Sequence, residues 1–215
     1  MKTIERTAVL LCGALLAAAA HAGPAEDAVV RLQHGWEEVK YAAPAPEQEK
    51  RFERLAAQAD EALARYPDRA DVLIWHGIVK ASYAGAKGGL GALSLAKGAR
   101  QDFEQALRID PKALAGSAYT SLGSLYYQVP GWPIGFGNDK KAEENLKQGL
   151  ALNPDGIDPN FFYGDYLYRN GKLDDAERYL RKALQAPPRP DRQMADEGRR
   201  KEINALLAKI AEQRR

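Results

Sequence analysis

The side chains that could carry out chemistry are few and far apart in this chain. The 215 residues include one cysteine and three histidines, His21, His34 and His76, and no partner residue lies at a spacing suited to a metal site. A lone helical histidine is more often a packed or surface residue than a ligand. No serine has a glycine two residues before it and another two residues after it, so the nucleophile elbow of hydrolases is absent. We therefore predict a protein that is not an enzyme and holds neither a metal ion nor a cofactor.

Two further patterns suggest chemistry at first sight. The glycine-rich stretch 85–91 lacks the Gly-Lys-Ser or Gly-Lys-Thr of a phosphate-binding loop, and we interpret it as a closely packed helix start. Adjacent acidic residues point to different sides of a helix and cannot share a site. We expect solvated faces at the acidic pairs and at a basic segment near the C-terminus: Glu37–Glu38, Glu143–Glu144, Asp174–Asp175 and Arg199–Lys201.

Composition and the first residues restrict the class of protein. Hydrophobic residues make up 45% of the chain and the formal net charge is +2, which excludes intrinsic disorder and argues against non-specific binding of nucleic acid. Residues 1–22 combine a basic start, a short apolar run and the small-x-small site Ala20-His21-Ala22, which is typical of a secretory signal. We predict a periplasmic protein whose single domain spans 23–215. Cys12 would leave with the signal, and the large Leu11 before it disfavours lipid attachment.

A phrase that recurs with a proline at its end predicts the fold. Four helical apolar patterns close at Pro67, Pro111, Pro154 and Pro188, and proline cannot continue a helix. The last interval is 34 residues, the period of a tetratricopeptide repeat. In that repeat Gly164 takes the small position of the first helix, opposite Leu180 of the second. The two earlier intervals are longer, which places inserts around 85–98 and 128–138.

The elements that follow from this pattern are all helical. We predict an all-α, tetratricopeptide-like solenoid of helical hairpins with two inserts, closed by an amphipathic capping helix. The predicted helices are 25–41, 47–65, 69–84, 90–109, 113–128, 139–152, 158–170, 173–186 and 192–213.

Aromatic residues around the second insert are the main candidates for binding. Trp132 and Phe136 lie in a loop with two prolines, and leaving such side chains in water costs roughly 2–3 kcal/mol each. They must fold back onto the core or dock a partner or ligand. Tyr127 precedes the loop, Tyr163 lies on the following first helix, and Lys87 beside the first insert could receive an acidic partner or an anionic ligand.

Three segments together resemble a known family. Gly85–Gly91, Tyr126–Pro133 and Gly137–Ala142 are similar to the TatT component family of TRAP transporters, and the resemblance runs from about Arg51 to Leu207. It implies a periplasmic tetratricopeptide-like protein that oligomerises and engages a transporter's solute-binding protein. Direct binding of a small apolar or amphipathic ligand is one alternative function. A scaffold for an envelope or secretion complex is the other.

Overall fold

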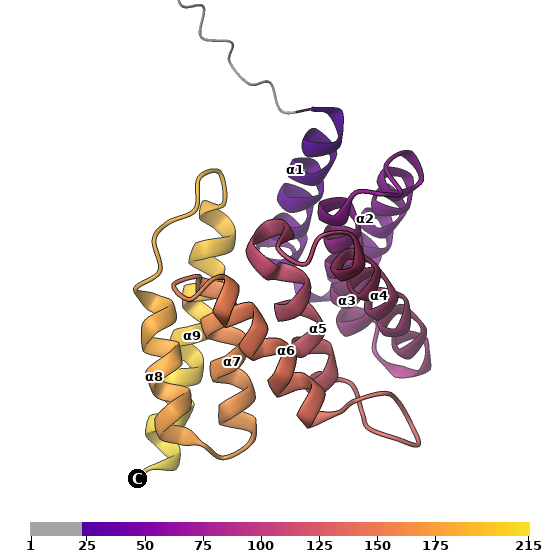
Figure 1. The fold of residues 1–215 in the computed structure, drawn as a ribbon. Coiled ribbons are helices and arrows are strands. Elements are labelled where there is room, and N and C mark those ends of the chain that lie inside the picture. The colour runs from indigo at the N-terminus through magenta and orange to yellow at the C-terminus, as the bar shows by residue number, and fades with distance from the viewer. Residues whose placement is uncertain (1–22) are drawn as a thin grey trace, which may run out of the picture.

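The computed structural model describes residues 23–215, apart from the side chain of Leu90. The predicted signal segment, 1–22, lies outside the described residues. Within them the chain forms nine α-helices joined by turns, which confirms the predicted all-α class (Figure 1). The helices are α1 (Pro24–Glu37), α2 (Ala45–Arg65), α3 (Ala70–Lys87), α4 (Gly89–Ile109), α5 (Ser117–Gln128), α6 (Asp139–Leu152), α7 (Ile157–Arg169), α8 (Leu173–Leu184) and α9 (Gln193–Gln213).

Consecutive helices pair as hairpins, and each hairpin packs on the next. The pairs are α1 with α2, α3 with α4, α5 with α6, and α7 with α8, while α9 covers the last pair. Figure 1 shows this succession from the indigo α1 to the yellow α9. The predicted capping helix 192–213 therefore has the expected place.

Local sequence explains where the helices stop and start. Pro67, Pro111 and Pro154 each lie two residues beyond the last residue of a helix, because proline cannot supply the next backbone hydrogen bond. At the start of α6, the Asn138 side chain accepts a hydrogen bond from the Lys141 backbone N–H at 2.9 Å, as an N-cap does. Gly171, with φ +71°, makes the left-handed turn between α7 and α8.

One glycine in each first helix lets the paired helix approach closely. A Cβ atom at Gly164 would lie 2.9 Å from Leu180 Cγ, and one at Gly77 would lie 2.6 Å from Phe103 Cε1. Gly123 faces Leu146 and Gly35 faces Leu55 in the same way. The large residues of these pairs are almost wholly buried, so the core runs along the four hairpin seams.

The two inserts adopt different structures. The first lengthens a hairpin rather than forming a loop, since α3 and α4 have 18 and 21 residues where α7 and α8 have 13 and 12. The second is an irregular loop, residues 129–138, between α5 and α6. An isolated bridge between Gly131 and Gly137 closes its neck.

The two ends of the helical array contact each other. After α1, a π-helical turn, η1 (Glu38–Ala42), brings its side chains against α9. Lys40 Nζ lies 3.4 Å from Glu202 Oε1, and the Tyr41 ring packs directly on Gly198, where no side chain could fit. The solenoid is thereby closed on one side.

Candidate functional site

The largest hollow of the described residues is a groove of about 850 Å³ between the first helices and α9. It is lined from α1, η1, α3, α5, α7 and α9, with a few residues from α2 and α4. Along α5 it extends from the first residue to the last, Ser117 to Gln128. At a rise of 1.5 Å per residue, that is about 16 Å of groove, the length of roughly five residues of extended chain.

A polar stripe on α5 forms one wall of this groove. Ser117, Ser121, Ser124 and Gln128 all line it. Their spacing of four, three and four residues places them on a single helix face. Hydroxyl and amide groups can both donate and accept hydrogen bonds, so the wall presents both functions at intervals of about 5–6 Å.

Aromatic side chains form the facing walls. Trp36 and Trp75 meet edge to face with ring centroids 6.1 Å apart, and Phe161 and Phe162 do so at 5.2 Å. The Trp36 indole N–H donates to Ser82 Oγ at 2.7 Å, which fixes the ring in place. Such walls bind apolar side chains and leave the polar stripe for main-chain groups.

A cluster of ion pairs joins α7 to α9 at the side of the groove. Arg189 Nη1 and Arg199 Nε donate to the two oxygens of Asp158 at 2.7 and 2.9 Å, and Arg199 also donates to Glu202 at 2.6 Å. Burial on its own would raise the pKa of Asp158. The two guanidinium groups outweigh it and lower that pKa from its ordinary value of 3.8 to about 2.

The same cluster corrects two of the sequence predictions. Arg199 and Glu37 were expected on solvated faces, but both are buried. Arg199 is enclosed because α9 lies against α7 and η1, and Glu37 because Arg192 at 3.3 Å reaches it from the start of α9. Arg200 likewise donates to the carbonyl oxygens of Leu184 and Ala186 at the end of α8. Only Lys201 of that basic segment is exposed.

The mouth of the groove contains an unusual backbone conformation. In the short helical turn η2 (Ala113–Gly116), Leu114 and Ala115 have φ of 47° and 53°, the left-handed region that residues with a side chain disfavour by roughly 1–2 kcal/mol each. Both residues line the groove. The turn places Leu114, which is partly exposed, at the groove edge.

The loop residues predicted to bind lie elsewhere and do different things. Trp132 is 90% exposed at the tip of the second insert. Phe136 instead folds back, with its ring edge to face with Tyr126 at 5.9 Å and the Arg100 guanidinium 4.6 Å above it. The structure therefore separates the two outcomes that the sequence left open for this pair.

The other three predicted residues are also outside the groove lining. Tyr127 donates from its hydroxyl to Asp165 at 2.8 Å, and burial followed by that carboxylate raises its pKa. Tyr163 is buried between Tyr166 and Tyr179 in the core. Lys87 is exposed and contacts Glu49 and the Tyr83 hydroxyl. The structure leaves their proposed binding roles as predictions.

His76 has a setting that the sequence did not predict. It is buried, with Nδ1 2.8 Å from Asp102 and Nε2 2.7 Å from Asp60, so it ties α3 to both α2 and α4. Among residues 23–215, no group of three histidine, cysteine, aspartate or glutamate residues could hold a metal ion. In the same part of the chain, no helix is long and apolar enough to span a membrane.

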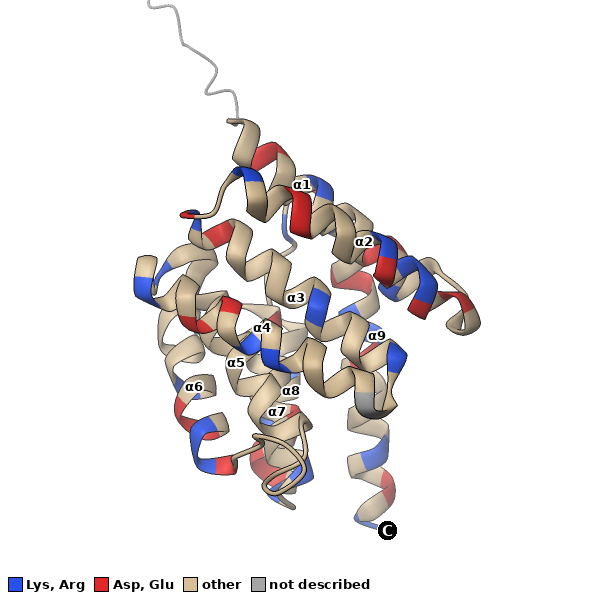
Figure 2. Ribbon diagram, turned by 90° about the vertical axis from the view of Figure 1, so that its right-hand side faces the viewer, with Lys and Arg blue, Asp and Glu red and all other residues tan. Residues whose placement is uncertain are grey.

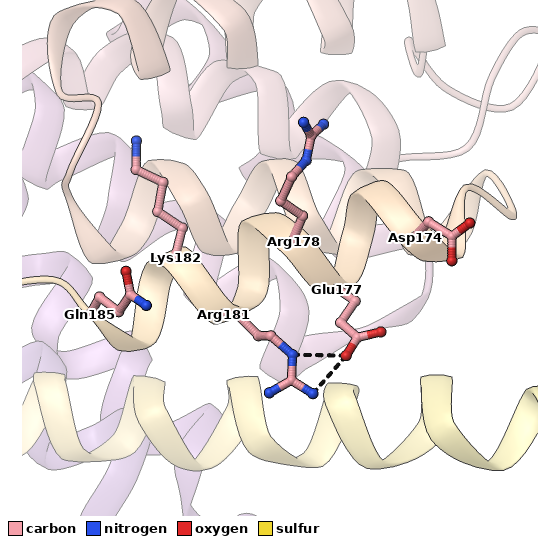
Figure 3. A pocket seen from close by; sticks show the side chains of 6 residues that line it. All are labelled: Asp174, Glu177, Arg178, Arg181, Lys182 and Gln185. Atoms are coloured by element: carbon pink, nitrogen blue, oxygen red, sulfur yellow. Dashed lines mark hydrogen bonds and ion pairs between the residues drawn. The ribbon is translucent and has the colours of Figure 1, made fainter.

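A second hollow on α8 has no free charge to offer. Figure 3 shows its lining of Asp174, Glu177, Arg178, Arg181, Lys182 and Gln185, with Arg181 bonded to Glu177. Arg178 pairs with Asp175 at 2.6 Å and Lys182 with Asp155 at 3.2 Å. We therefore take the groove as the candidate site.

Comparison with known proteins agrees with this architecture. The tetratricopeptide repeat family matches residues 157–190, which contain α7 and α8. No curated protein matches the chain. The crystal structure of TTC0263, a thermophilic TPR protein of Thermus thermophilus, is similar with a TM-score of 0.56 and 21% identity, over 87% of this chain and 90% of that one.

Two further solved structures match less well. The crystal structure of MamA has a TM-score of 0.45 and 19% identity, over 77% of this chain and 90% of that chain. Pseudomonas aeruginosa pilF has a TM-score of 0.38 and 17% identity, over 88% and 90%. The repeat match and the first structure show a tetratricopeptide-like helical fold, which is the architecture of protein-interaction scaffolds.

Proposed function

We propose that this protein is a non-enzymatic adaptor whose groove holds an extended segment of a partner polypeptide. The observation that carries the proposal is the polar stripe on α5 facing aromatic walls along the whole helix. An extended chain repeats every two residues, about 6.6 Å, and exposes main-chain donors and acceptors throughout. Hydroxyl and amide groups 5–6 Å apart suit those groups, and the aromatic walls suit alternate side chains.

The finer assignment is to the periplasm and to a TRAP-type transporter. We propose that the partner is the transporter's solute-binding protein, on the strength of the secretory features of residues 1–22 and the resemblance of the three segments between Gly85 and Ala142. The scaffold of another envelope or secretion complex would use the same groove with another polypeptide.

A second candidate function rests on the size of the groove. A volume of about 850 Å³ lies within the range of small-molecule pockets, and a site with aromatic walls would accept an apolar or amphipathic compound. The two candidates differ in what occupies the polar stripe, because a small apolar ligand leaves it unused.

A photo-crosslinking side chain at Ser121 tests both candidates. Ser121 lies in the middle of the stripe, and Ser94, exposed on α4 outside the groove, provides the matched control position. We expect irradiation in periplasmic extract to attach a polypeptide at Ser121 and not at Ser94, and mass spectrometry to identify it. A small adduct would favour the second candidate. Equal labelling at both positions would contradict the proposed polypeptide site.

A further inference from the structure

The tip of the second insert carries the most exposed large apolar side chains of the described residues. Trp132 is 90% exposed and Ile134 is 70% exposed, whereas the other large apolar residues are at most 43% exposed. Covering each would stabilise a contact by roughly 2–3 kcal/mol. An exposed tryptophan of this kind is typical of the residues that dominate interfaces.

The loop holds this tip in a fixed shape. Ile134 and Gly135 donate backbone hydrogen bonds to the Gly131 carbonyl at 3.1 and 3.0 Å, and Gly137 donates to Pro130 at 2.9 Å. Phe136 attaches the base of the loop to the core, as described above. A preformed tip loses little conformational entropy on binding, which favours insertion into a complementary hollow.

The groove is suited to an occupant without charge. Its acidic groups are already paired within the chain: Asp158 with Arg189 and Arg199, Glu202 with Lys40 and Arg199, and Asp165 with Arg169. A charged occupant would have to displace one of these pairs or remain unpaired. Residues 129–138 contain no charged side chain, and Figure 2 shows the loop as an uninterrupted tan segment.

The tip cannot be accounted for by its own groove. None of the described residues from 129 to 138 lines that groove, and the loop lies against α4, where the backbone at Gly135 is close to Leu93. A bilayer surface is a poorer occupant, because the first turns of α6 next to the loop mix acidic and basic residues, Asp139, Lys140, Lys141, Glu143 and Glu144.

We propose that the groove takes the Trp132–Ile134 tip from a second copy of this chain. The inference rests on the proposed function, since it uses the same polypeptide-binding groove and names a partner for it. Tip and groove are different surfaces, so the contact is heterologous: each copy gives its tip to one neighbour and receives a tip from another. Ring closure or open chains follow from such a contact.

Two variants, each lacking one of these surfaces, test the proposal by complementation. W132A/I134A removes the tip, and S121R fills the groove, with S124R as a second groove variant. The matched controls are I109A, an exposed apolar residue elsewhere, and S94R on α4. Circular dichroism melts establish that each variant folds. Sedimentation velocity then measures the mass of each variant alone and of equimolar mixtures.

We expect the native chain and both controls to self-associate, and either variant alone to do so at least about tenfold more weakly. The mixture should form a one-to-one dimer, because one intact tip meets one intact groove and neither end can add a third copy. A mixture that stays monomeric, a groove variant that still self-associates, or a native chain that is monomeric throughout would each overturn the proposal. So would sedimentation of the native chain, but not of W132A/I134A, with anionic lipid vesicles in place of self-association.

The two proposals fail separately. If the tip does not enter the groove, W132A/I134A keeps the partner polypeptide that photo-crosslinks at Ser121. If no partner polypeptide exists, the dimer of the two variants still forms.

Discussion

Single residues at the hairpin seams decide how closely the helices approach. Gly164 faces Leu180 and the Ala176 carbonyl, so a larger side chain has no room there. Gly156, in the turn before α7, has an ordinary φ of −70°, and a Cβ atom would meet only the side-chain amide of Asn153, which can rotate away. The two glycines are close in sequence and differ in what surrounds them.

A comparison of two substitutions tests this difference. Gly164→Leu should lower the free energy of unfolding by about 1–3 kcal/mol through overpacking, and Gly156→Leu should lower it by clearly less. Thermal melts of the two variants provide the measurement. Equal, negligible shifts would show that the helices are not held at the distance described.

At the scale of elements, the second insert divides its work between two aromatic residues. Phe136 is half-buried against Tyr126 and Arg100, whereas Trp132 has almost no contact. Phe136→Ala should therefore cost about 1–3 kcal/mol of stability, less than a fully buried phenylalanine. Trp132→Ala should change the melting temperature very little. Matching shifts for the two, measured by circular dichroism, would contradict the division.

The sequence predicted the hairpins that keep the repeat spacing. Gly77, Gly123 and Gly164 were recognisable as small positions because the prolines mark each repeat. Gly35 plays the same part in the first hairpin, but the π-helical turn and the following linker place it 24 residues before Ala59, so the spacing did not reveal it.

The groove was only half visible in the sequence. The recurrence of Ser117, Ser121, Ser124 and Gln128 on an otherwise apolar helix is a local signal that could have been found. The aromatic and charged walls were not predictable in this way, because they form only where α9 meets η1. Tyr41 and Glu202, which hydrogen-bond at 3.4 Å, are 161 residues apart, and no periodicity within one helix reports such a contact.

For the whole molecule, Asp158 links the last hairpin to the helix that closes the groove. Its folded-state pKa of about 2 lies below its ordinary value of 3.8, so its carboxylate stabilises the fold above about pH 4. That contribution, at most about 2 kcal/mol, is lost as the pH falls through 2. Denaturant unfolding at pH 5 and at pH 2.5 should show a smaller loss for Asp158→Asn than for the native chain. Asp68→Asn, at an exposed position, is the control and should behave like the native chain.

Closure of the array also sets an order of events during synthesis. In an open solenoid each hairpin is complete once its neighbour exists. Here Tyr41 waits for Glu202, 161 residues later, and at about 5–20 residues per second that interval is roughly 8–30 s. Throughout it, Trp36 and Tyr41 have no α9 to cover them. The surface that becomes the wall of the groove is first a stretch of uncovered aromatic rings, and that is the kind of surface that chaperones exist to protect.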